Sequence, residues 1–149
     1  METTNDKVYK EIREILEKNR DAEKGYAKAA DKAESAALKS YFRRKSTERR
    51  DFNAKLVGEI QTAYPDFDAN GSFAGNIHRA WMDVKALFSM DNDEAMLEEA
   101  IRGDKAAIDE YDDVLDKYNL PTGLRFLLSE QRENIQMEVA QNKTLEDLA

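Results

Sequence analysis

The fold is decided by the stretch YPDFDANGSFAGNIHRAWMDVKALFSMD, residues 64–91, which separates two pairs of long amphipathic segments. Pro65 ends the helix before it, because its ring disfavours a helical conformation at Tyr64. Residues 66–72 predict a loop, and apolar residues at helical spacing then predict a short helix over residues 72–89. A helix of that length rises about 25 Å, enough to return along most of a bundle. A single long crossover of this kind joins the hairpins of a ferritin-like four-helix bundle.

The segments on either side of the crossover have the pattern of bundle helices. Apolar or small residues recur every three or four positions, which places them on one helical face. This pattern predicts helices over residues 4–34, 36–63, 92–118 and 121–143. The joints within each pair are short, so the paired helices are antiparallel neighbours. The expected fold class is therefore all-α: one domain over residues 1–149, a ferritin-like four-helix bundle with a long crossover containing a short helix.

The composition disfavours several classes of protein. The chain has no cysteine, which excludes disulfide frameworks, thiolate metal sites and cysteine catalysis. Its apolar runs are much shorter than the about twenty residues of a membrane span. Its first residues have neither the basic start nor the apolar run of a signal peptide. A net charge of −8 disfavours binding to nucleic-acid phosphates. We expect a cytoplasmic protein with no membrane and no nucleic-acid partner.

One local cluster has the opposite charge. It consists of Arg43, Arg44, Lys45, Arg49 and Arg50. The cluster could bind a small anion or nucleic acid, but Glu48 and Asp51 are interleaved with it and the whole chain is acidic. These features favour a solvated helix face instead.

Each long helix carries a polar residue near the middle of its inward stripe. These residues are Asn19, Glu48, Asp104 and Gln131. Because the midpoints of four bundled helices lie at one level, the pattern predicts a polar layer across the core. Tyr26 and Tyr111 flank this layer and can hydrogen-bond into it, and Arg49 is a partner for Glu48 or Asp104. Since unpaired polar groups are costly in a core, the layer indicates either a structural hydrogen-bonded network or a metal or small-ligand site.

A carboxylate metal site is the alternative that spacing can test. A di-iron bundle uses a Glu from each of two helices and a Glu-x-x-His pair from each of the other two. The candidate ligands are Glu48, Asp51, Glu98, Asp104, Glu130 and Glu133. Neither pair with three-residue spacing, Glu48 with Asp51 or Glu130 with Glu133, contains histidine. The single histidine, His78, lies on the crossover and cannot complete a two-histidine site.

The stretch GSFAGNIHRAWMDVK, residues 71–85, resembles the G-S-x-x-G-x-x-H-R-x-W-x-D-x-K motif of DUF2383, a bacterial family of unknown function. Similarity to this family extends over most of the chain, including residues 21–30, 48–52 and 98–111. The resemblance implies a ferritin-like fold and carries over no catalytic residue. It also implies that His78, Arg79, Trp81 and Asp83 tie the crossover to the bundle.

Together these patterns favour a non-catalytic bundle without a cofactor: a structural, stress-associated or interaction protein. The sequence lacks a Gly-rich phosphate loop, G-x-S-x-G and H-E-x-x-H, so no enzyme motif opposes this expectation. Two alternatives stay open. One is a carboxylate metal-binding protein that uses iron or manganese, and the other is a carrier of a small apolar ligand at the polar layer. Helical bundles often pair, so a homodimer is the assembly to test.

Overall fold

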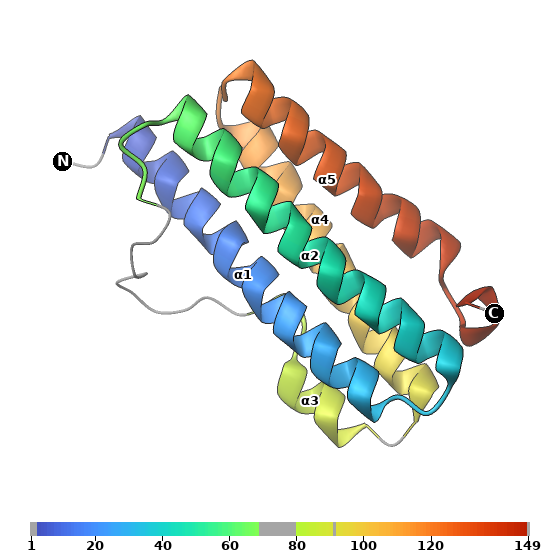
Figure 1. Ribbon diagram of the computed structural model, residues 1–149. Helices are drawn as coiled ribbons and strands as arrows, with labels where there is room; N and C mark the ends of the chain where they lie inside the picture. Colours follow the sequence, from blue (N-terminus) through green and yellow to red (C-terminus); the bar gives the residue numbers. More distant parts are fainter. Residues whose placement is uncertain (1–2, 69–79, 91, 149) are drawn as a thin grey trace.

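The computed structural model describes residues 3–68, 80–90 and 92–148, and Figure 1 shows a bundle of long helices. In order along the chain, the described elements are α1 (Thr4–Lys32), α2 (Ala36–Ala63), α3 (Val84–Ser89), α4 (Asp93–Lys117), α5 (Thr122–Gln141) and the 3-10 helix η1 (Leu145–Leu148). No strand occurs among these described residues. The predicted all-α helical bundle is confirmed.

Short polar residues cap the starts of three long helices, α1, α2 and α4. The Thr3 hydroxyl accepts a hydrogen bond from the Asp6 N–H, while the Asp6 carboxylate accepts one from the Thr3 N–H, both at 3.1 Å. Ser35 caps α2 and Asn92 caps α4 in the same way through their side-chain oxygens. Each cap satisfies an N–H that has no partner within its own helix.

The contacts at the helix ends establish the direction of each helix. Asp93, at the start of α4, accepts hydrogen bonds from the Glu34 and Ser35 N–H groups, at 2.9 and 2.8 Å. The start of α4 therefore lies beside the α1–α2 joint, and Figure 1 shows α2 and α4 running in the same direction. In the bundle, α1 packs against α2 and α4, and α5 packs against the same two helices. The chain must consequently travel the length of the bundle between α2 and α4.

The helix within the crossover is shorter than predicted. We expected it over residues 72–89, but residues 80–83 are non-helical and α3 begins only at Val84. The Asp83 side chain accepts a hydrogen bond from the Ala86 N–H at 3.0 Å, which makes Asp83 the N-cap. Both Trp81 and Met82 are buried, and a bent chain lying across α4 buries these neighbouring side chains together. The rest of the predicted helix, residues 72–79, lies outside the described residues.

Two apolar clusters fill the core. Ile12, Leu56, Val114 and Leu124 belong to one cluster, and Ala29, Leu38, Phe42 and Leu97 belong to the other. The buried polar residues are Asn19, Lys45, Arg49, Asn53, Asp104 and Gln131. None of the helices in the described ranges combines the length and apolar character that a bilayer crossing demands.

Candidate functional site

Asp104 is the centre of the charged layer, which we define as Asp104, Lys45, Arg49, Tyr26, Asn19, Tyr111 and Gln131. Its carboxylate is buried in the middle of α4 and accepts three hydrogen bonds. Oδ1 accepts from Arg49 Nη2 at 2.6 Å and from the Tyr26 hydroxyl at 2.7 Å, and Oδ2 accepts from Lys45 Nζ at 2.7 Å. Burial alone would raise the pKa of Asp104, but Lys45 and Arg49 outweigh burial and hold this pKa below its usual value. The carboxylate is therefore ionised and fully paired.

Arg49 joins the carboxylate to two aromatic rings and an amide. Its guanidinium carbon lies 5.8 Å from the centre of the Tyr26 ring and 5.6 Å from that of Trp81. Its Nη1 donates to Asn19 Oδ1 at 3.3 Å. Burial would lower the pKa of Arg49, but the charge of Asp104 raises it above its ordinary value. The Asp104 carboxylate thus binds the edge of the planar guanidinium, and the rings of Tyr26 and Trp81 contact it through cation–π interactions.

A neutral chain of hydrogen bonds extends the layer to α5. Asn19 Nδ2 donates to the Tyr111 hydroxyl at 3.3 Å, and that hydroxyl donates to Gln131 Oε1 at 2.8 Å. Gln131 Nε2 then donates to the Phe52 carbonyl at 3.0 Å, so the series of hydrogen bonds ends on the backbone of α2. Burial raises the pKa of Tyr111 to about 12, so its hydroxyl stays protonated and can donate. The layer consequently crosses α1, α2, α4 and α5.

The substitution Tyr111→Phe should measure how much this series of hydrogen bonds contributes to stability. It removes one hydroxyl and leaves Asn19 Nδ2 and Gln131 Oε1 without their partner in a buried place. We expect the free energy of unfolding in urea to fall by about 1–3 kcal/mol. A change below about 0.5 kcal/mol, the range typical of surface sites, would contradict the hydrogen-bonded chain.

The solvated face that we predicted for the basic cluster is wrong for Lys45 and Arg49, which are each 1% exposed. Arg43, Arg44 and Arg50 are exposed, as expected for that face. The difference arises from helical register. Lys45 and Arg49 continue the three- and four-residue steps of the buried stripe from Leu38 and Phe42 to Phe52, Leu56 and Ile60. This stripe agrees with the expectation that Arg49 pairs with Glu48 or Asp104 in the layer, and it was the signal that could have placed Lys45 in the core as well.

Glu48 lies at the edge of the layer rather than in its centre. Its side chain is 23% exposed, and its Oε1 lies 3.7 Å from both Lys45 Nζ and Arg49 Nε. Glu138 of α5, which the sequence reasoning missed, lies on the other side of Lys45, with 3.3 Å between Oε1 and Nζ. Its position seven residues after Gln131 puts it on the same helical face, which was the available signal.

The proposed metal ligands do not come together. Asp51, Glu98, Glu130 and Glu133 are exposed, and Asp104 is enclosed by its cationic partners. Within residues 3–68, 80–90 and 92–148, no group of three or more His, Asp or Glu side chains could hold a metal ion. Asp51, Glu130 and Glu133 lie on the outer faces of α2 and α5. Three-residue spacing puts two side chains on the same face of a helix but does not say whether that face is inner or outer, which explains why the sequence pattern was misleading.

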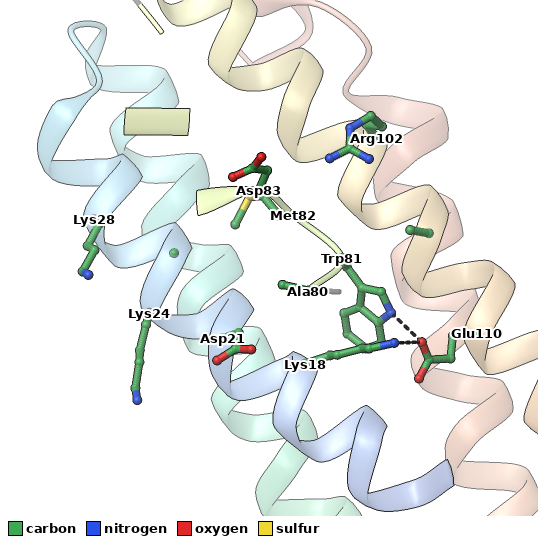
Figure 2. Close-up of a pocket in the computed structure, with 12 residues that line it drawn as sticks. Lys18, Asp21, Lys24, Lys28, Ala80, Trp81, Met82, Asp83, Arg102 and Glu110 are labelled. Atoms are coloured by element: carbon green, nitrogen blue, oxygen red, sulfur yellow. Dashed lines mark hydrogen bonds and ion pairs between the residues drawn. The ribbon is translucent and has the colours of Figure 1, made fainter. Parts of the chain in front are cut away.

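The crossover is anchored through Trp81, as Figure 2 shows. Trp81 Nε1 donates to Glu110 Oε1 at 3.1 Å, and Lys18 of α1 forms an ion pair with the same oxygen. The backbone N–H of Asp83 donates to Glu99 Oε2 at 3.0 Å, so Asp83 contacts α4 through its main chain. His78 and Arg79, the other two predicted anchors, lie outside the described residues. A cavity of about 730 Å³ lies beside Trp81, and charged side chains of α1 and α4, including Lys18, Asp21 and Glu110, line it.

Comparison with known proteins identifies the family. A family model described as a domain of unknown function (DUF2383) matches residues 7–117. Searches of curated proteins and of solved structures found no match. The matched region runs from the first turns of α1 to the end of α4 and includes every residue of the charged layer except Gln131. The resemblance noted in residues 71–85 is confirmed, and the chain belongs to the DUF2383 family.

Proposed function

We propose that the protein is a non-catalytic helical bundle, a structural or interaction protein whose charged layer holds the helices in register. The pairing of Asp104 carries this proposal. Three donors from α1 and α2 bind its two oxygens at 2.6–2.7 Å, and two of them are cations that a metal ion would have to displace. Sliding or rotating α2 against α4 would leave a buried charge unpaired, and this penalty favours a single register.

Other features favour this proposal over its two alternatives. Iron or manganese would need carboxylates that converge, whereas Asp51, Glu130 and Glu133 point to solvent. A carrier of an apolar ligand would need an apolar cavity, but side chains occupy the layer and charged groups line the cavity beside Trp81.

Metal content tests the proposal directly. We expect untagged protein expressed with added iron and manganese to contain no stoichiometric metal by plasma mass spectrometry. Iron(II), manganese(II) and zinc(II) should leave its thermal unfolding midpoint unchanged, because a ligand stabilises only a folded state that binds it. Stoichiometric metal in the wild-type protein that is lost in Asp104→Asn would contradict the proposal. Exposed Glu130→Gln serves as the matched control for general effects of charge.

The outer face of α5 supports a role in interaction. Phe126 is 68% exposed and Met137 is 53% exposed, and they are the large apolar side chains most open to solvent in the described chain. Eleven residues separate them, so they lie three turns apart on one face. A homodimer, a cytoplasmic location, the lack of nucleic-acid and membrane partners, and the ferritin-like classification stay predictions.

A further inference from the structure

Two carboxyl groups with unsatisfied oxygens meet where α2 packs against α5. Glu48 Oε1 and Glu138 Oε1 are both buried, and neither accepts a hydrogen bond from the described chain. Both Oε1 atoms lie beside Lys45 Nζ, at 3.7 Å for Glu48 and 3.3 Å for Glu138, which brings the two side chains within reach of a hydrogen bond between them. Two ionised carboxylates cannot form that bond, because neither has a proton to donate. A single proton held between them would supply the missing donor to both.

The balance of charge around these groups favours the same proton. Lys45 is the cation nearest to Glu138, but its hydrogen bond at 2.7 Å goes to Asp104 Oδ2. Arg49 likewise donates to Asp104, and its Nε lies 3.7 Å from Glu48 Oε1. Three carboxyl groups therefore surround two cations, and one negative charge is left over. In a partly buried site, adding a proton removes the excess charge at less cost than ionising all three acids.

We propose that Glu48 and Glu138 share one proton at neutral pH, forming a proton-binding site that joins α2 to α5. While the proton is bound, the pair carries one negative charge, which together with that of Asp104 balances the charges of Lys45 and Arg49. When the proton leaves, two like charges face each other across the helix interface with one shared lysine between them. Release of the proton therefore weakens the attachment of α5, the helix that lies beyond the family match.

The titration of Glu138 supports this site. Burial raises the pKa of Glu138 from its ordinary 4.5 to about 8, with Glu48 and Asp104 adding to the rise and Lys45 opposing it. The groups that face the carboxyl pair are Tyr41, Lys45 and Arg49 of α2 and Asp104 of α4. Burial and nearby carboxylates raise the pKa of Tyr41 beyond the physiological range, so its phenol does not titrate with the pair.

The expected pH dependence has a definite sign. Below about pH 4.5 the folded and unfolded chains both hold the proton. Between that pH and about 8 the unfolded chain has released it while the folded chain retains it. Unfolding therefore releases a proton, and this site makes the protein less stable as pH rises through that range. The effect levels off above the folded-state pKa.

Carboxyl-detected ¹³C NMR of the wild-type chain, with thermal unfolding at pH 5 to 9, tests the proposal. We expect one glutamate carboxyl to titrate near pH 8. In Glu138→Gln, whose amide supplies the missing donor without a charge, the fall in unfolding midpoint across this range should shrink by roughly 5 °C. In Glu48→Gln, the titration of Glu138 should move down towards its ordinary value, because the like charge is gone and an amide donor replaces it.

Glu130→Gln is the matched control, since it removes the same charge from an exposed position of α5. Its pH dependence should match that of the wild-type protein. The proposal is overturned if every wild-type glutamate titrates below about pH 6. It also fails if Glu138 still titrates near pH 8 in Glu48→Gln, because burial alone would then account for the shift. The NMR titration needs no variant, so misfolding of a variant cannot obscure that first result.

Discussion

Replacing Asp104 by leucine is expected to lower the free energy of unfolding by about 3–5 kcal/mol. The substitution removes the carboxylate that accepts hydrogen bonds from the buried Lys45 ammonium and Arg49 guanidinium, at 2.7 and 2.6 Å. The two cations would then keep only their longer contacts to Glu48 and Glu138, at 3.3–3.7 Å, and the Tyr26 hydroxyl would lose its acceptor. Urea unfolding followed by circular dichroism measures the loss, which in a chain of this length corresponds to a drop of about 10 °C or more in unfolding midpoint.

Two further variants test whether the loss of stability comes from the buried ion pairs. Asp109→Leu changes an exposed carboxylate five residues along the same helix and should shift stability by less than about 1 kcal/mol. The triple variant Lys45→Met, Arg49→Leu, Asp104→Leu removes the three most buried charges together and should recover part of the loss, as apolar replacement of buried ion pairs often does. The recovery is partial because Glu48 and Glu138 lose their nearest cations. If Asp104→Leu alone behaved like Asp109→Leu, then Lys45 and Arg49 would have access to water and the layer would not be closed.

Replacing Gly103 by valine should detach the crossover from the bundle and lower the free energy of unfolding by about 3 kcal/mol. A Cβ at this position would lie 2.9 Å from Met82 Cβ, 3.2 Å from Met82 Cα and 3.2 Å from the Trp81 carbonyl oxygen. Two of these atoms are backbone, so a flexible side chain cannot simply move aside. Trp81, the single tryptophan and only 5% exposed, reports the change. Its fluorescence emission should shift to longer wavelength as the indole meets water.

Gly58→Ala provides the matched control for this experiment. A Cβ there meets nothing within 4 Å, and Gly58 lies inside α2. The alanine should leave the emission unchanged and stabilise the protein by about 0.5–1 kcal/mol, the difference between the two residues inside a helix. Wild-type emission and stability in Gly103→Val would show that residues 81–82 do not pack tightly on α4.

The helices could be predicted because their apolar stripes are long and regular. The break in each stripe also located Asn19, Asp104 and Gln131, which the structure buries in one layer. Arg49 was expected in the layer as a partner for Glu48 or Asp104, although its basic cluster was assigned to solvent. Lys45 was misjudged because residue type outweighed position, since lysine side chains are usually at the surface. The burial of Asp104 was itself the missing argument, since a buried carboxylate needs cations at the same level of the bundle.

The crossover shows a different reason for failure. Apolar residues at helical spacing predicted a continuous helix over residues 72–89, yet Trp81 and Met82 are both buried in a non-helical stretch. Helical periodicity is informative when a helix buries only one of its faces. Trp81 and Met82 are consecutive residues that are both buried, so their apolar character does not report a helical face. Asp83 was the informative residue, because a short acceptor ahead of residues 84–89 is typical of a helix start. The pairing of Glu48 with Glu138 depends on how α2 meets α5, which no local pattern encodes.

The wide sequence separations within the charged layer have a consequence for folding kinetics. Asp104 bonds to Tyr26, Lys45 and Arg49, which lie 78, 59 and 55 residues away along the chain. The α1–α2 hairpin has a short joint and can nucleate early, but the layer closes only after the crossover has returned α4 to it. Interactions that form after the rate-limiting barrier leave the folding rate nearly unchanged and slow unfolding. We therefore expect the layer chiefly to slow unfolding and so to lengthen the lifetime of the native state.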